Sequence, residues 1–246
     1  MTGMATCPLV GLSFLGTVSR NSKQNYEIAK QQSFMRDKTM PLQNRMDPEG
    51  CIHITPSRGT VMGNRGGRIH DPETKKLTKR RWANKAWIIC VTEFNNRQRA
   101  LMGYSYTELF FLDEVTALAA GHRPCFECRR KAAKAYQAAW QRAENLTEAP
   151  KVGVMDPILH AERLDGKAQR HHTIHKLDLV DGVMISHEGA LYAIKGEQLL
   201  RWSFEGYAKP STSIDDLPNM CTSLTPPASL KALGHGYQPI WHPSAI

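Results

Sequence analysis

Two cysteines three positions apart, Cys125 and Cys128, are the residues whose type and spacing indicate chemistry most directly in this sequence. They lie in a run from Gly121 to Lys131, between a short alanine-rich stretch and a longer basic one. A Cys-x-x-Cys turn at the start of a helix aims both sulfurs at one point, as a tetrahedral zinc ion requires. The unpaired N–H groups of such a helix favour the thiolate form that binds metal. The pair therefore predicts a zinc site.

Two further ligands are needed to close a structural zinc site. Cys90 lies on a β-branched and aromatic run, 87–94, and is the predicted third ligand; the alternative is an ordinary buried cysteine of a strand. His70 follows a glycine-rich loop and is the predicted fourth ligand. It ranks ahead of three other candidates, His122, His53 and Cys51. A redox role for the pair is disfavoured, because no thioredoxin-like βαβ unit precedes it.

The elements that must position these side chains predict an α+β fold. We expect a short antiparallel sheet with a helix initiated by the Cys-x-x-Cys turn, and a smaller β-rich C-terminal unit. Strands are expected at 52–54, 60–62, 87–94, 99–102, 106–111, 183–185, 191–194 and 198–202. Helices are expected at 114–120 with Asp113 as N-cap, at 127–142, at 156–164 opened by Asp156 and Pro157, and at 225–233.

The chain divides into three parts. Residues 1–39 are polar and poor in acids, which predicts a disordered tail or a start upstream of the natural one at Met40, with a targeting peptide as the alternative. Residues 40–148 are predicted to form a zinc-stabilised α+β domain, and residues 149–246 a helix followed by a β-meander.

The charge of the chain indicates a polyanionic partner. The formal net charge is +9, and eight of the basic residues fall between Arg58 and Arg81, near Trp82 and Trp87. A clustered excess of this kind predicts nucleic acid, most simply DNA, while a solvated surface loop is the alternative. The predicted contacts are Arg65, Arg68, Lys76, Lys79, Arg80, Arg81, Arg130 and Lys134.

Cysteine usage and hydropathy indicate the cellular compartment in which the protein is expected. Four of the six cysteines are scattered and the close pair has metal-ligand spacing, so a reduced, cytoplasmic protein is expected. No run of about 18 apolar residues occurs, so no membrane partner is expected. The oligomeric state is left open.

The residues around the cysteine pair resemble part of a known module. Phe110, Phe111, Glu114, an alanine-rich helix and the Arg-Pro-Cys-x-x-Cys-Arg turn are similar to the second half of the metal-binding module of Ada-type DNA repair proteins, over about residues 109–130. The resemblance implies that Cys125 and Cys128 are zinc ligands. In that family a Cys-x-x-x-Cys upstream supplies the other two thiolates, one of which accepts a methyl group from DNA. This chain has only Cys90 in that region. The remainder resembles an uncharacterised bacterial protein family.

These observations predict a zinc-containing DNA-binding or DNA-processing protein, related to repair, in which the metal is mainly structural. The alternative is a zinc-dependent nucleobase deaminase or other small-molecule hydrolase, with His160 and the catalytic Glu162 acting beside Cys125 and Cys128. A third class, a nuclease or glycosylase, would use a cluster of polar residues after position 160: Glu162, His171, His172, His175, Asp178 and Asp181. Whether the protein is an enzyme is left open.

Overall fold

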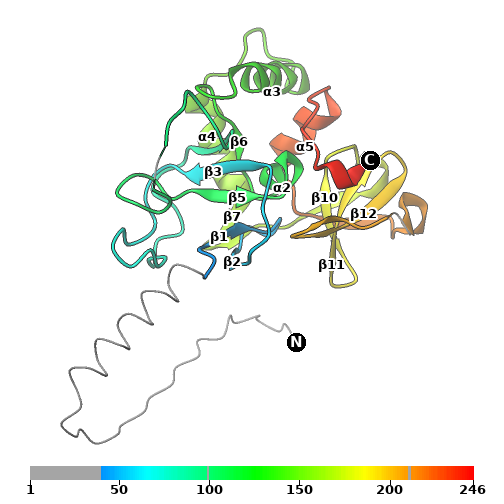
Figure 1. Cartoon of the computed structure of the whole chain (residues 1–246). Helices are drawn as coiled ribbons and strands as arrows, with labels where there is room; N and C mark the ends of the chain where they lie inside the picture. The colour runs from blue at the N-terminus through cyan, green and yellow to red at the C-terminus, as the bar shows by residue number, and fades with distance from the viewer. Residues whose placement is uncertain (1–39, 99, 210–211) are drawn as a thin grey trace, which may run out of the picture. The chain divides into compact units, whose positions relative to one another are not determined.

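The computed structural model describes residues 40–98, 100–209 and 212–246, and Pro41–Ile246 forms one compact unit (Figure 1). The prediction for residues 1–39 lies outside the described residues. The fold is α+β, as predicted, with two large sheets and four α-helices in the described part. No helix in this part is long and apolar enough to cross a membrane.

The first sheet has six short strands in the order β2-β1-β5-β3-β4-β6. Three of its pairings are antiparallel, but β1 pairs with β5 and β4 with β6 in parallel, so the sheet is mixed and not purely antiparallel as predicted. Its strands are β1 (Gln43–Met46), β2 (Ile52–Ile54), β3 (Val61–Arg65), β4 (Trp87–Cys90), β5 (Leu109–Phe111) and β6 (Arg123–Pro124). The expected strand at 99–102 is absent from its described residues, where the backbone turns and Met102 has a positive φ of 50°.

The second sheet contains the predicted meander. Its strands follow the order β13-β12-β11-β10-β15-β9, with β14 beside β12, and every pairing is antiparallel. They are β9 (His172–His175), β10 (Met184–His187), β11 (Ala190–Lys195), β12 (Gln198–Ser203), β13 (Gly206–Tyr207), β14 (Thr212–Ser213) and β15 (Met220–Ser223). A separate small hairpin pairs β7 (Leu164–Asp165) with β8 (Ala168–Gln169).

Two helices begin where the sequence did not predict. The helix α4 spans Val152–Arg163 and contains Pro157, so Asp156 is not its cap. The Asp156 carboxylate instead accepts two hydrogen bonds from Arg123, at 2.7 and 2.9 Å, which keep it buried inside the fold. The helix α3 (Arg130–Ala143) begins after the cysteine turn rather than at Glu127. The remaining helices are α2 (Glu114–Ala119), α5 (Pro227–Gly234), and three short 3₁₀ turns, η1 (Lys176–Asp178), η2 (Ile214–Asp216) and η3 (Pro243–Ala245).

The helix α2 joins the two sheets. All six of its residues are buried, and Asp113 caps it as predicted by accepting the Thr116 N–H at 2.9 Å. Its Ala117 and Leu118 belong to a large core that includes residues from both sheets, while Val115 packs with residues of the meander. The core thus contains residues from both sides of the predicted boundary at 148, and that boundary stays a prediction.

Candidate metal centre and its pocket

Three cysteines from separate elements converge at one end of the first sheet. Cys90 is the last residue of β4, and Cys125 directly follows β6. Because β4 and β6 pair in parallel, with Ile89 opposite Pro124, these two cysteines reach the same level of the sheet. The Cys125 N–H donates to the Ile89 carbonyl at 2.9 Å, and the turn then returns Cys128 to the same place. The three Sγ atoms all lie within 4.8 Å of one another.

The donor set fits a zinc ion. With Zn–S bonds of about 2.3 Å, the sulfurs of a tetrahedral site lie roughly 3.8 Å apart, and three convergent thiols need little adjustment to reach that spacing. Thiolates are also the ligands that select zinc over magnesium or calcium. The cysteine turn is already in a ligand-like conformation, since the Glu127 N–H donates to the Cys125 sulfur at 3.3 Å.

The three thiols differ in their ionisation. Hydrogen bonds from the thiols of Cys128 and Cys90, and then from backbone N–H groups, hold the pKa of Cys125 far below its ordinary value. The pKa values of Cys90 and Cys128 are raised, because each donates to the Cys125 sulfur. The sequence predicted a lowered pKa for both members of the turn. In the structure only the pKa of Cys125 is lowered, because its sulfur accepts hydrogen bonds from both other thiols.

Two buried ion pairs hold the cysteine turn from either side. Arg123 precedes the turn and binds Asp156 of α4 at 2.7 Å. Arg129 follows it and donates two hydrogen bonds to Glu114 of α2, at 2.7 and 2.8 Å. The Arg-Pro-Cys-x-x-Cys-Arg pattern contained both arginines, but nothing in it identified their acidic partners, which are distant in sequence.

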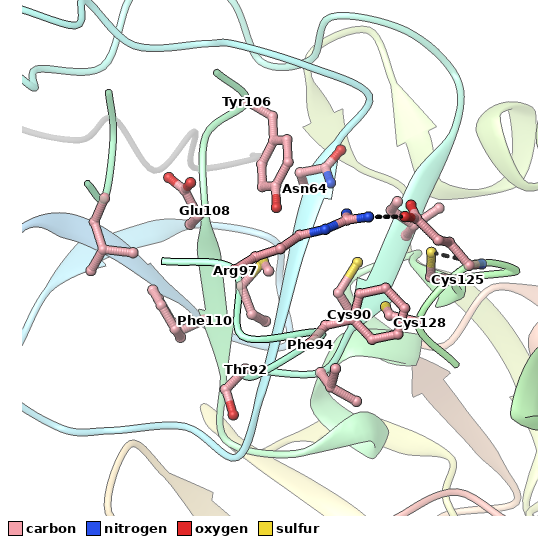
Figure 2. A pocket seen from close by; sticks show the side chains of 15 residues that line it. Asn64, Cys90, Thr92, Phe94, Arg97, Tyr106, Glu108, Phe110, Cys125 and Cys128 are labelled. Atoms are coloured by element: carbon pink, nitrogen blue, oxygen red, sulfur yellow. Dashed lines mark hydrogen bonds and ion pairs between the residues drawn. The ribbon is translucent and has the colours of Figure 1, made fainter. Parts of the chain in front are cut away.

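A pocket of ≈ 210 Å³ adjoins the three sulfurs. Figure 2 shows Cys90, Cys125 and Cys128 on one side of this pocket and Glu108 and Tyr106 on the other. The Glu108 carboxylate is buried and accepts the Met102 N–H at 2.8 Å. The remaining lining combines apolar and polar side chains; the apolar ones include Ile88, Phe94, Leu101 and Phe110, and the polar ones are Asn64, Thr92, Arg97 and Glu127. Sequence reasoning missed Glu108, because a single glutamate beside an apolar run carries no spacing signal.

An exposed ion pair lies in the wall of the same pocket. Arg97 donates to Glu127 at 2.9 Å, and its guanidinium lies over the Phe94 ring, 5.2 Å from the centroid. Their side chains are 46% and 62% exposed, so they can move without disrupting the core. The pair can therefore adjust when a ligand enters.

The structure does not bring His70 to the sulfurs. Its buried ring hydrogen-bonds to Thr107 Oγ1 at 2.5 Å through Nδ1 and to the Gly103 carbonyl at 2.7 Å through Nε2. Both nitrogens are therefore occupied in fixing the 103–107 loop. Among the described residues, the group of potential ligands at this place consists of the three cysteines alone.

The other candidate ligands also lie elsewhere. His122 is buried between Phe111 and Trp87, with ring centroids 4.8 and 5.1 Å away, and burial holds its pKa well below the ordinary value. His53 pairs with an acid, Asp47, at 2.7 Å, and Cys51 is exposed.

The predicted deaminase residues are likewise not assembled with the cysteines. His160 packs edge-on against Trp82 and shares a hydrogen bond of 3.0 Å with Arg163. The Glu162 carboxylate accepts the Ala228 N–H at 2.9 Å, at the start of α5. Neither residue belongs to the sulfur group in the described structure.

The later histidines and acids form no ligand cluster in the described structure. His172 hydrogen-bonds to the Glu162 carbonyl at 2.8 Å, and His175 accepts the Leu177 N–H as the cap of η1. These contacts serve the local backbone. The expectation of a nuclease-like or glycosylase-like cluster among residues 162–181 therefore has no geometric counterpart here.

Most of the basic residues predicted to bind nucleic acid are exposed. Arg81 is half-buried, and the exposed ones are Arg68, Lys76, Lys79, Arg80, Arg130 and Lys134. Arg65 is the exception, because it is buried and its guanidinium lies over the Trp87 ring, 4.1 Å from the centroid. It is the last residue of β3, and its side chain follows the sheet inward rather than extending into solvent.

No protein-family model, no characterised protein and no solved structure matches this chain. The similarity to the Ada-type module therefore stays a prediction. Any functional assignment depends on the geometry of the site itself.

Proposed function

We propose that this protein is a zinc-dependent hydrolase in which Cys90, Cys125 and Cys128 bind one Zn²⁺ facing the adjoining pocket. The observation that carries the proposal is that all three convergent sulfurs also line the pocket wall. Structural zinc sites are enclosed by four protein ligands, whereas catalytic sites keep three and leave one position for water or substrate. A zinc ion held here would supply an activated water at the pocket surface. This assignment departs from the expectation of a mainly structural metal.

The residue that we assign to proton transfer is Glu108. Hydrolytic zinc sites pair the metal with a carboxylate that is not a ligand and that moves the proton between water and leaving group. Glu108 is a buried acid of the same pocket, and the Met102 N–H holds one of its oxygens at 2.8 Å. In this proposal Glu108 takes the role that the sequence had suggested for Glu162.

The walls of the pocket favour a planar substrate. Phe94, Tyr106 and Phe110 provide aromatic surface, and polar side chains such as those of Asn64 and Glu108 lie among the apolar ones. Pockets of this kind bind a small ring against the aromatic walls and orient it through the polar contacts. We therefore propose a nucleobase, free or in a nucleoside, as the substrate class.

The metal is tested first. Protein purified without added metal is expected to contain about one zinc per chain, and the Cys128→Ser variant close to none. Cys221→Ser is the matched control, because Cys221 is a buried cysteine of β15 whose thiol donates to the Pro218 carbonyl. Zinc-free wild-type protein, or equal zinc loss in both variants, would remove the basis of the proposal.

Catalysis is tested with ammonia release from cytidine and adenosine. Glu108→Gln is expected to keep zinc and fold but to lose turnover by a factor of about 10² or more. Glu127→Gln is the control, because Glu127 lines the same pocket but is 62% exposed and pairs only with Arg97 in the described structure. A zinc-loaded wild-type protein without turnover on either nucleoside would exclude this substrate class.

A second candidate function is nucleic-acid binding in the cytoplasm, favoured by the exposed basic side chains of the 68–80 segment. Binding to a DNA oligonucleotide should fall steeply with salt, and the Lys79→Ala/Arg80→Ala double variant should reduce the slope of log affinity against log salt by about 2. Lys151→Ala, at another exposed position, is the control. Salt-independent or absent binding would contradict this candidate.

A further inference from the structure

A small hollow beside Trp87 collects positive charge inside the fold. Its lining includes four cationic side chains, Arg65, Arg81, Arg163 and Lys167, against one carboxylate, that of Glu49. None of its lining residues lines the metal pocket. We propose that this hollow is a binding site for a small oxyanion, with inorganic phosphate or a phosphate monoester as the ligand class. The inference is independent of the proposed hydrolase.

Arg65 and Arg163 are held in place by the backbone and by Trp87. Each is only 2% exposed, and their guanidinium groups lie 4.1 and 3.8 Å from the centroid of the Trp87 ring. Arg65 donates to the Gly50 carbonyl at 2.9 Å, and Arg163 donates to the Gly121 carbonyl at 2.8 Å. Carbonyl oxygens and a ring face orient a guanidinium but do not neutralise its charge.

Two glycines allow the backbone to approach Arg65 and Arg163 closely. Gly50 and Gly121 both have a positive φ, 72° and 79°. A Cβ at Gly121 would lie 2.6 Å from Arg163 Cδ, and a Cβ at Gly50 would lie 2.8 Å from Gln169 Oε1 and 3.1 Å from an Arg65 nitrogen. The chain therefore approaches both arginines closely at positions where only glycine fits without strain. The same device at both arginines indicates a built site rather than an accidental cluster.

The charges in the hollow are not balanced within the described structure. No described acid forms an ion pair with any of the four cations, which are Arg65, Arg81, Arg163 and Lys167. The Nε atoms of all three arginines are buried and lack a hydrogen-bond partner among the described residues. Buried cations are normally paired, because leaving water without a counter-charge is costly. Arg123 and Arg129 follow this rule, with Asp156 and Glu114 as partners.

The electrostatics agree with an anion at this place. Burial, and then repulsion from Arg81, lowers the pKa of Arg65 to about 9. Burial, and then repulsion from Arg65, lowers the pKa of Arg163 to about 9. An oxyanion would relieve both causes, since its oxygens accept from several guanidinium groups at once.

The size of the hollow restricts the ligand. It is narrow, with a cavity volume of ≈ 10 Å³, and Lys167 at its mouth is exposed. That space admits about one oxygen atom, so an oxyanion would insert one oxygen between the arginines and keep its remainder at the mouth. The half-buried Arg81, with no side-chain hydrogen bond to another described residue, can close on such an ion.

The test titrates the full-length protein with inorganic phosphate against sodium chloride at matched ionic strength. We expect phosphate to raise Tm and to shift the Nε–H NMR signals of Arg65 and Arg163, while chloride does neither. Arg81→Ala and Lys167→Ala avoid the two buried arginines, so they should fold. Each should weaken phosphate affinity about tenfold, because a charge-assisted hydrogen bond is lost. Lys131→Ala, on the exposed face of α3, should leave it unchanged.

The outcomes separate clearly. Equal effects of phosphate and chloride would show only ionic-strength screening and overturn the proposal. Phosphate affinity that survives in both Arg81→Ala and Lys167→Ala would place the ion elsewhere and also overturn it. A larger affinity for a phosphate monoester than for inorganic phosphate, lost in Arg81→Ala, would support the site and identify an organic ligand that extends from the mouth.

Discussion

The two sheets of this protein differ in how far apart along the chain their neighbouring strands lie. In the second sheet, β10, β11 and β12 are neighbours both along the chain and in space, so each pairing is a local hairpin. In the first sheet the spatial order β2-β1-β5-β3-β4-β6 departs from chain order, and two pairings are parallel. Only such non-local pairing can place Cys90 beside Cys125. The three candidate metal ligands therefore lie at the first sheet, where strand order departs from chain order.

Buried charge follows the same division. The buried charged side chains of the described structure all lie between positions 47 and 163: Asp47, Arg65, Glu108, Asp113, Glu114, Arg123, Arg129, Asp156 and Arg163. In the described residues after 163, the buried polar side chains are Ser223, Thr225 and Ser229. The region up to residue 163 thus buries many charged groups, and each burial has a desolvation cost, whereas the described residues after 163 contribute mainly apolar packing. Substitutions in the two regions should differ accordingly.

The largest difference is expected at the buried ion pair of α2. Glu114→Gln removes the charge that faces Arg129 and leaves a buried guanidinium without its counter-ion. The free energy of unfolding should fall by about 3–5 kcal/mol. The control is Glu144→Gln, because Glu144 pairs with Lys231 at 2.8 Å on the surface, and its loss should be below about 1 kcal/mol. Equal losses in urea denaturation would contradict the comparison.

The next difference concerns two glycines with similar backbone conformations. Gly121 beside Arg163 has a φ of 79°, and Gly189 in the β10–β11 turn has a φ of 74°. A Cβ at Gly121 meets Arg163 at 2.6 Å, whereas a Cβ at Gly189 meets nothing within 4 Å. Both Gly→Ala changes add left-handed strain of about 1–2 kcal/mol, and Gly121→Ala should cost roughly 1–3 kcal/mol more through overpacking. Equal urea midpoints for the two variants would show that the Arg163 side chain moves away from the added Cβ without a cost in stability.

The elements that sequence reasoning predicted are those governed by local rules. The Asp113 cap, the meander and the cysteine turn follow from residues a few positions apart, and all three are present. Cys90 was named from a strand expected beneath the turn, and its sulfur lies with the other two. The local signals sufficed there because the third partner was also a cysteine on a clear strand.

Three residues whose positions the sequence did not predict share a non-local cause. Asp156 and Pro157 have the local signature of a helix start, but the ion pair with Arg123 holds Asp156 within α4. Arg65 belongs to a basic stretch by sequence, yet its strand directs it under Trp87. His70 was assigned to the metal by residue type, and the 103–107 loop occupies both its nitrogens. In each case a partner distant in sequence decides the position.

A smaller and more specific difference is expected for two buried isoleucines. Ile89 of β4 and Ile185 of β10 are both fully buried, so each Ile→Val change should lower the free energy of unfolding by about 0.5–1.5 kcal/mol. Only Ile89→Val should also weaken zinc binding, because the cavity that it leaves loosens the packing of β4 directly beside Cys90. Competition with a zinc chelator measures this. Weakened zinc binding in Ile185→Val as well would show that the meander also shapes the metal centre.

The smallest effect is a pH dependence in the first sheet. A hydrogen bond from His53 to Asp47 raises the pKa of His53 above 6.5, although its partial burial acts in the opposite direction. A raised pKa in the folded state means that the stabilisation is complete below the unfolded value of about 6.5 and is lost as pH rises through the folded value. Because the side chain is 44% exposed, the change should stay below about 1 kcal/mol. Urea denaturation between about pH 5.5 and 8.5 should show this decline in wild type but not in His53→Gln, which cannot titrate. A decline that persists in the variant would assign it to another group and leave the Asp47 contact without a role in stability.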